Sequence, residues 1–373
     1  MKELVKLASN PRIFVFTVIW LMVLVFFGTL AQRDVGLYAS QQKYFSSYFF
    51  WIFNILPVPG GRTTMLVMFT NLISMLFKRN IWKFKKIGIV IVHLGAVLLL
   101  VGGGITAGFS SEGNMTIDEN KRSSHVDDYH IMELAVMKIE RDSLRYTVFD
   151  QPLLKEGQLI SHESLDFKIE VIDYFPNCSF QERITPPGLD YKGFLKNFVL
   201  FEKKSEKENT QNRPAIIFLI KDASVEIDGV YGLFLGQRIE QALSIKGTDH
   251  VIEIRRKRTH LPFTIELLDF KKVLHPGTDI PQSFSSEINL IENDIPRRVL
   301  IQMNEPLRYK GYTFFQASFI EGIEGESTVL AVVKNYGRLF PYISSIVMCV
   351  GLLIHLLISV PKLIKKNTGN LAQ

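Results

Sequence analysis

The sequence is poor in the residues that build redox and haem-attachment motifs. It has two cysteines in 373 residues, Cys178 and Cys349, and contains no Cys-x-x-Cys pair. A dithiol redox centre and a c-type haem attachment motif within this chain are therefore excluded. The two cysteines fall in different environments, so we expect them not to pair. We expect Cys178 to be a buried apolar side chain, the alternative being a transient partner in thiol exchange.

Charged residues are missing from three long apolar runs. Residues 13–30, 87–109 and 341–360 contain no aspartate, glutamate, lysine or arginine. Each run approaches or meets the roughly 20 apolar residues that a helix needs to cross a bilayer. A shorter run, 63–77, carries Asn71 and predicts a fourth transmembrane helix. No small-residue cleavage site follows the first run, so we interpret it as an uncleaved anchor.

The basic residues predict how these helices are oriented. Lysine and arginine are concentrated in residues 1–12, 78–86 and 361–373, which are expected to share the cytoplasmic side. The loop 31–62 and the large segment 110–340 then lie outside. The formal net charge of +6 comes partly from these flanks, so we do not take it as evidence for nucleic-acid binding. The predicted fold is an integral membrane protein with four helices and one large extracytoplasmic domain.

Segment 110–340 is predicted to be rich in β-strands. Apolar and polar residues alternate in several short stretches separated by turn signals such as Pro176-Asn177 and Lys310-Gly311. The expected strands are 166–175, 251–254, 263–270, 299–303 and 328–333. The polar run 203–213 is expected to be an exposed loop. Regular strands without helical periodicity predict an antiparallel sandwich or barrel-like fold.

This outside segment shows no catalytic constellation. The glycines at 229, 232 and 236 lack the spacing and the Gly-Lys-Ser/Thr ending of a phosphate loop. Its six histidines are scattered, at positions 125, 130, 162, 250, 260 and 275. His125 and His130, five residues apart and close to the third span, could approach a ligand. The alternative is that they are surface or turn histidines.

Two histidines lie inside the apolar runs. His93 is seven residues after Lys86, and His355 is seven residues before Lys362. At 1.5 Å per residue, each is roughly 10 Å from the cytoplasmic basic flank, so we expect similar depths. An ionisable residue at such depth is by default a candidate functional residue. Two opposing neutral imidazoles make a low-spin, six-coordinate haem site, which makes both candidate haem-iron ligands.

Other roles for these histidines stay open at this point. Each could instead form a hydrogen bond to a neighbouring helix without any ligand. A proton relay usually brings aspartate or glutamate partners, and none of the runs contains one. Gly88, Gly95 and the glycines at 102–104 would allow close approach of a helix or a porphyrin.

Several stretches resemble the ResB family, the membrane subunit of System II cytochrome c assembly. They are GTLAQRDVGLYASQQKYFSSYFFWIFNILPVPGGR (28–62), VHLGAVLLLVGGGITA in the third span, LPFTIELLDFKKVLHPGTDIPQSFSSEINL (261–290) and VLIQMNEPLRYKGYTFFQASF (299–319). The layout of three spans, a large outside domain and a last span is also similar. Residues 125–250 match only in general character.

The resemblance implies a function and a set of partners. Such proteins work with a ResC/CcsA-like membrane protein that has a tryptophan-rich motif, which this chain, with three tryptophans, lacks. Together they carry haem b across the bacterial inner membrane and attach it to apocytochrome c, whose thiols a reducing protein keeps reduced. This chain would be a non-catalytic subunit of the haem lyase, without catalytic residues of its own. We expect the partner to be a separate chain.

The resemblance also bears on the two histidines. A third-span histidine is a haem ligand in the family, and His93 occupies that position. The second ligand in the family comes from the partner, so His355 is carried over less directly. Two other functions remain open: a b-type haem protein for electron transfer across the bilayer, and a haem-free scaffold or sensor with an outside ligand-binding domain.

Overall fold

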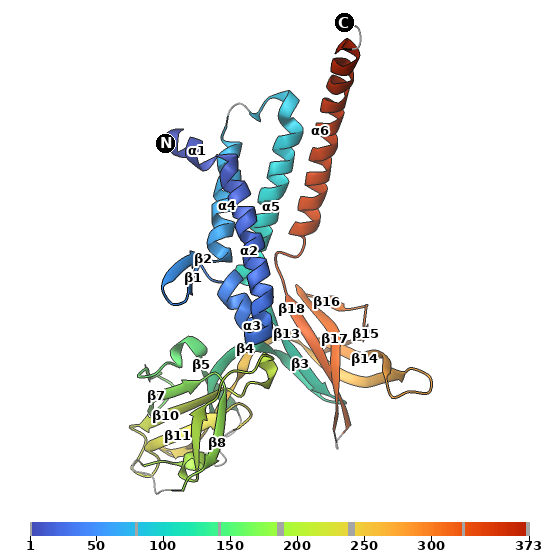
Figure 1. Cartoon of the computed structure of the whole chain (residues 1–373). Helices are drawn as coiled ribbons and strands as arrows, with labels where there is room; N and C mark the ends of the chain where they lie inside the picture. The colour runs from blue at the N-terminus through green and yellow to red at the C-terminus, as the bar shows by residue number, and fades with distance from the viewer. Residues whose placement is uncertain are drawn as a thin grey trace. The chain divides into compact units, whose positions relative to one another are not determined.

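The computed structural model describes residues 2–78, 81–140, 143–184, 190–237, 243–322 and 325–370. Residues 79–80 of the expected basic loop, the Pro186-Pro187-Gly188 turn and residues 371–373 of the expected tail lie outside these ranges. The chain divides into two compact units (Figure 1). Unit 1 comprises Met1–Ser111 and Lys334–Gln373, and unit 2 comprises Glu112–Val333.

Unit 1 is mainly helical. Its elements are α1 (Lys2–Ala8), α2 (Pro11–Val35), α3 (Leu37–Ser40), the π-helical η1 (Gln41–Phe45), β1 (Phe49–Ile52), β2 (Leu56–Pro59), α4 (Gly61–Leu76), the 3₁₀ turn η3 (Phe84–Lys86), α5 (Ile87–Phe109) and α6 (Phe340–Asn370). Local signals set the ends of α2. The Asn10 side chain accepts a hydrogen bond from the Arg12 N–H, Pro11 opens the helix, and Gly36, at φ 84°, ends it.

Three helices in the described chain are long and apolar enough to cross a membrane. They are Pro11–Val35, Phe84–Phe109 and Phe340–Pro361, which correspond to the three charge-free runs of the sequence. The length and composition of these helices indicate a multi-pass membrane protein. The fourth expected span, 63–77, is a helix of 16 residues, α4, about 24 Å long. Whether α4 crosses the bilayer stays a prediction.

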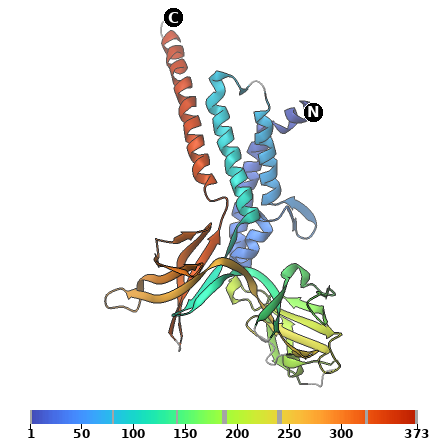
Figure 2. The ribbon, with the colours of Figure 1, turned by 180° about the vertical axis from the view of Figure 1, so that it is seen from behind.

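The chain between α2 and α4 folds back along α2. The Ser40 hydroxyl donates to the Gly28 carbonyl (2.6 Å), and a Cβ added to Gly28 would lie 2.9 Å from the Phe45 ring. A Cβ added to Gly61 would lie 2.6 Å from the Phe45 carbonyl oxygen, so the end of η1 abuts the start of α4. The β1–β2 hairpin is inserted between these two helical pieces and stands out beside α2 and α4 in both views (Figures 1 and 2).

Unit 2 is built from antiparallel strands. A ten-stranded sheet has the order β15-β14-β13-β4-β3-β18-β17-β16, with β12 beside β13 and β5 beside β4. Its strands are β3 (Ser111–Asp118), β4 (Arg122–Ile139), β5 (Leu144–Asp150), β12 (Leu243–Ile245), β13 (Thr248–Leu274), β14 (Pro281–Glu292), β15 (Ile295–Gln302), β16 (Leu307–Tyr309), β17 (Tyr312–Gly322) and β18 (Gly325–Lys334).

Two smaller sheets and three short 3₁₀ turns make up the rest of the described part of unit 2. One sheet has the order β11-β10-β7-β6 and the other pairs β8 with β9. Their bounds are β6 (Leu159–Ile160), β7 (Lys168–Phe175), β8 (Cys178–Glu182), β9 (Phe198–Glu202), β10 (Ala215–Lys221) and β11 (Gly229–Phe234). The turns are η4 (Gln151–Leu153), η5 (Gly193–Lys196) and η6 (Asn209–Gln211), the last within the expected polar loop.

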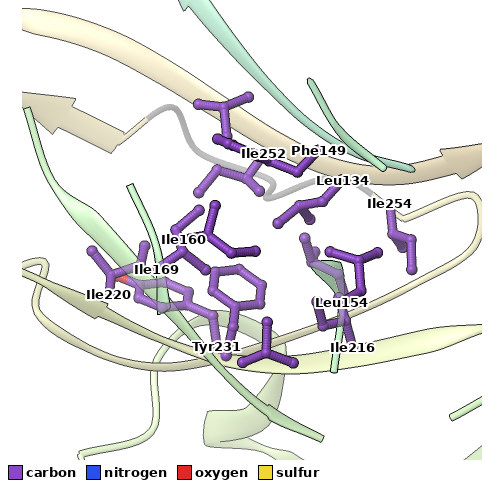
Figure 3. Packing of buried hydrophobic residues seen from close by; sticks show 14 of the residues in the cluster. Leu134, Phe149, Leu154, Ile160, Ile169, Ile216, Ile220, Tyr231, Ile252 and Ile254 are labelled. Carbon is purple, nitrogen blue, oxygen red and sulfur yellow. The ribbon is translucent and has the colours of Figure 1, made fainter. Parts of the chain in front are cut away.

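Two long strands, β4 and β13, run through two separate hydrophobic cores. Leu134 on β4 and Ile252 on β13 belong to the first core, which fills the space between the large sheet and the β11-β10-β7-β6 sheet (Figure 3). Val126 on β4 and Ile265 on β13 belong to the second core. The pairing is irregular between these parts, at 256–258 and 260–265. The predicted β-rich character is confirmed, and the first core has a sandwich arrangement.

Candidate functional site

Helices α5 and α6 pack through a stripe of glycines. Gly88, Gly95 and Gly102 recur every seven residues on one face of α5. A Cβ added to Gly88 would lie 2.6 Å from the Gly351 carbonyl oxygen, and one added to Gly95 would lie 2.5 Å from Met348 Cγ. Small residues let two membrane helices approach until their backbones touch. The glycines of the third run therefore serve helix contact here.

His93 on α5 has a hydrogen-bond partner for one ring nitrogen, Nδ1, among the described residues. Its Nδ1 lies 2.8 Å from the carbonyl oxygen of Ile89, one turn earlier on the same helix. Because a carbonyl oxygen can only accept a hydrogen bond, Nδ1 carries the ring proton. The Nε2 lone pair is then available, as a metal-ligating imidazole requires. The side chain is half-buried, so the residue fits the role of a single axial ligand to haem iron.

His355 lies where α6 meets the glycine stripe. A Cβ added to Gly88 would lie 2.5 Å from the His355 backbone nitrogen and 2.8 Å from its Cα. The Nδ1 atom of its ring is buried, and no hydrogen-bond partner for it lies within the described residues. The backbone of His355 is thus part of the helix contact.

The structure does not bring the two histidines together. His355 lies beside Gly88, and His93 is five residues further along α5, about 7.5 Å along the helix axis. Five residues also turn the helix by roughly 140°, so His93 faces away from the α6 contact. The equal depth expected from the basic flanks is not met in this helix register. Haem ligation by His93 or His355 stays a prediction, and the two do not form one site within this chain.

The histidines of unit 2 are dispersed, with one exception. His125 on β4 pairs directly with His260 on β13, and their ring centroids are 6.2 Å apart. Burial, followed by the nearby Arg258 guanidinium, lowers the pKa of His125. His130, the other histidine singled out from the sequence, bonds through Nδ1 to the Asn209 amide (2.7 Å) instead. Within the described ranges, no three His, Cys, Asp or Glu side chains gather into a metal site.

Cys178 is a buried apolar side chain, as expected. It belongs to a small core with Leu195, Leu200 and Val230, and it is a free cysteine. Burial raises the pKa of its thiol, although Arg213 opposes this shift. The reactive thiolate is therefore disfavoured, and the thiol-exchange alternative has no support from the geometry.

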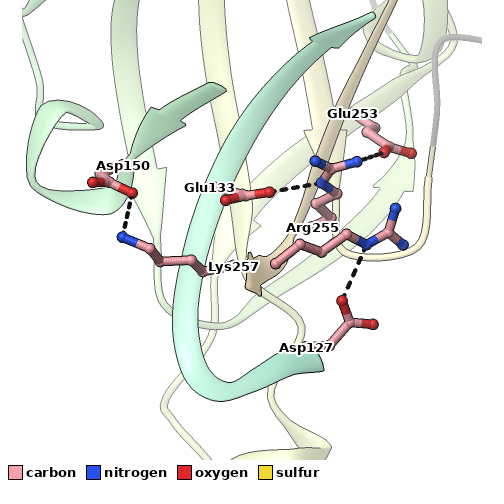
Figure 4. Close-up of polar contacts among 7 residues, drawn as sticks. Asp127, Glu133, Asp150, Glu253, Arg255 and Lys257 are labelled. Atoms are coloured by element: carbon pink, nitrogen blue, oxygen red, sulfur yellow. Dashed lines mark hydrogen bonds and ion pairs between the residues drawn. The ribbon is translucent and has the colours of Figure 1, made fainter. Parts of the chain in front are cut away.

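Sequence reasoning missed a buried cluster of charges between β4 and β13 (Figure 4). Arg255 Nε lies 2.8 Å from a carboxylate oxygen of Glu133, and Arg255 Nη1 lies 2.9 Å from one of Glu253. The side chains of Arg255 and Glu133 are only 11% and 4% exposed. The available signal was the run 255–258, Arg-Arg-Lys-Arg, directly after an alternating strand. Such a run is ordinarily interpreted as a solvated face.

Comparison with known proteins identifies relatives of this chain. Residues 229–326 match the model of the ResB-like family, a range that contains both outside stretches on which the resemblance was based. Protein NrfI of Wolinella succinogenes is 24% identical over 304 residues, which cover 78% of this chain and 29% of that protein.

A second relative is the cytochrome c biogenesis protein CcsB of Prochlorococcus marinus. It is 30% identical over 95 residues, 25% of this chain and 21% of that protein. The chain thus spans less than a third of the length of either relative. The resemblance to the ResB family is thereby confirmed, and residues 229–326 form a ResB-like family region.

Proposed function

We propose that this chain is a membrane subunit of the cytochrome c assembly machinery. It would hold haem b in transit in the inner membrane and present it for attachment to apocytochrome c. The relatives support this proposal, since one is named a cytochrome c biogenesis protein and the other covers most of this chain. Unit 2 would lie on the extracytoplasmic side, as the basic flanks of the helices predict.

The single observation that supports the haem part is the state of His93. Its Nδ1–H donates to the Ile89 carbonyl, so the proton is on Nδ1 and the Nε2 atom of this half-buried ring carries the lone pair that a metal ligand needs. Haem iron is the cargo, and it would take this nitrogen as one axial ligand. Position 93 is seven residues from Lys86, so haem would be held nearer the cytoplasmic leaflet.

The second axial ligand would come from another protein. The His355 backbone contacts α5 at Gly88, five residues before His93, and this offset supports a second ligand from outside this chain. A ResC/CcsA-like membrane partner would supply that ligand and the outer-face haem site. Unit 2 would contribute docking and positioning of the apocytochrome, whose thiols form thioethers with the haem vinyl groups. Positioning of reactants is itself a large part of catalysis.

The test is an absorption spectrum of the detergent-purified protein co-expressed with its partner. We expect a low-spin haem b spectrum in the wild type, its loss in His93→Ala, and its retention in His355→Ala. Added imidazole should restore the spectrum of His93→Ala, because it replaces the missing ligand without repairing a fold. His275→Ala, an exposed histidine of unit 2, serves as the matched control.

Three results would contradict the proposal. A wild-type protein without haem would favour the scaffold or sensor function. A haem spectrum that survives in both His93→Ala and His355→Ala would show that neither histidine is a ligand. Loss of the spectrum in His355→Ala alone would show that His355 on α6, and not His93 on α5, is the ligand.

A further inference from the structure

The β1–β2 hairpin is an uncharged and mostly apolar projection from unit 1. The chain from 44 to 61 has no charged residue, both strands consist of aromatic, aliphatic and proline residues, and Asn54 in the turn is the one polar residue between 49 and 59. Phe53 and Ile55 at the turn are 90% and 80% exposed, and Phe49 and Trp51 on β1 are more than half exposed. Only Phe50, with its partner Val58, is buried against α2. An apolar surface of this kind marks an interaction site.

The hairpin is attached halfway along an apolar helix. The indole N–H of Trp20 on α2 donates to the carbonyl of Pro59 (2.9 Å), and Leu24 shares a core with Phe50. Trp20 lies within the charge-free run 13–32, about 10 Å from its start and about 18 Å from its end. When α2 spans the bilayer, the base of the hairpin is therefore inside the hydrocarbon layer.

The backbone of β2 has few free N–H groups that the hydrocarbon layer would leave without a hydrogen bond. Gly60 N–H bonds to the Tyr48 carbonyl, which fixes the alternation of the ladder, so positions 57 and 59 direct their backbone nitrogens outward. Both positions are prolines, which have no N–H to leave unsatisfied. The Pro59 carbonyl, which also points outward, is taken by Trp20. The outer edge of β2 thus lacks free donors.

The outer edge of β1 has no such protection. By the same alternation, the N–H and C=O groups of Phe49 and Trp51 point away from β2. The hairpin is a two-stranded sheet in the described chain, so no third strand covers this edge. Open strand edges are not tolerated against lipid in the hydrocarbon layer, and non-helical backbone there is covered by protein.

We propose that this hairpin is the docking element for the helices of a second membrane protein. The apolar side chains of Phe53, Ile55 and Trp51 would pack against the apolar face of those helices. The open β1 edge would be met by uncharged polar side chains such as serine, threonine or asparagine, which form hydrogen bonds between membrane helices. An uncharged partner surface fits because the hairpin has no charge to offer. The inference rests on the proposed function in one respect: the ResC/CcsA-like membrane protein named there is the partner that is co-expressed in the test.

The test is photo-cross-linking in membranes of cells that co-express the partner. A benzophenone amino acid replaces Phe53, which is 90% exposed, in one variant and Phe16, a 69% exposed phenylalanine on α2, in the other. We expect an adduct with the summed mass of the two proteins from position 53, at least about tenfold stronger than from position 16. Absence of this adduct, or an adduct of two copies of this chain, overturns the proposal.

A second measurement separates protein from lipid as the cover. Brominated lipids quench tryptophan that touches acyl chains, and the difference between the wild type and Trp51→Phe isolates the contribution of Trp51. In the complex we expect no quenching of Trp51; quenching in the complex would show that lipid covers the hairpin. The haem spectrum of the same samples reports on the proposed function. A normal spectrum without the adduct shows that only the docking proposal has failed.

Discussion

Replacing Arg255 with methionine should destabilise unit 2 far more than an ordinary surface substitution. The guanidinium binds the carboxylates of Glu133 and Glu253, and all three side chains are at most 12% exposed. Methionine fills a similar volume but supplies no positive charge. Two carboxylates on neighbouring strands are then left buried together without a counter-charge.

The expected magnitude follows from the burial. Breaking a buried ion pair by removing one partner costs about 3–5 kcal/mol. For a unit of this size, 1 kcal/mol shifts the melting temperature by about 2–4 °C, so the midpoint should fall by roughly 10 °C. Neutralising both acids, as Glu133→Gln and Glu253→Gln, should restore much of the stability.

The assay is a thermal melt of the full chain in detergent, followed by the β-strand signal in circular dichroism. Lys257→Met is the matched control on the same strand, because Lys257 pairs with Asp150 (2.7 Å) near the surface. This exposed pair should contribute under about 1 kcal/mol. If Arg255→Met melts within about 2 °C of Lys257→Met, the cluster is hydrated and the reasoning from burial is wrong.

Three further predictions concern other parts of the chain. Gly88→Ala should lower the free energy of unfolding by about 1–3 kcal/mol, since its Cβ would meet the backbone of α6. Gly104→Ala, with nothing within 4 Å of its Cβ, should be neutral or slightly stabilising. Thermal melts followed by tryptophan fluorescence measure both effects. Burial lowers the pKa of His250, so the unfolded chain binds more protons, and stability should fall as the pH drops below about 6.5. Thermal melts at mildly alkaline and at mildly acidic pH should show that acidification lowers the melting temperature less in His250→Gln than in the wild type. An equal decrease in both proteins would exclude His250 as its cause. In Cys349→Ser protein, maleimide should label Cys178 at least about tenfold more slowly in the native state than after unfolding, and equal rates would contradict its burial.

The helices and strands were largely predictable because their signals are local. Charge-free runs of membrane length coincide with α2, α5 and α6, and α2 begins at Pro11, next to its Asn10 cap. Alternating residues identified the strand that begins at Lys168, and the turn at Lys310, with φ 45°, lies between β16 and β17. Such features depend on a few neighbouring residues, which a single sequence contains.

The candidate site was less predictable because it depends on helix register. Counting from the basic flanks placed His93 and His355 at one depth, but the contact of Gly88 with His355 sets a different register. That register arises from packing between helices some 260 residues apart in sequence, and no local pattern encodes it. The β1–β2 hairpin was also missed, since Pro57 and Pro59 indicate a loop unless their outward positions are known.

The pairing of β4 with β13 imposes an order in time on folding. Glu133 and Arg255, which face each other on these strands, are 122 residues apart in sequence. At about 5–20 residues per second, a ribosome needs roughly 6 to 24 s to produce the second strand after the first. Both cores contain residues of these two strands, so neither can be completed during that interval. A newly made β4 therefore exposes apolar residues such as Leu134 for seconds, which makes this stretch of the chain a natural client for a holding chaperone.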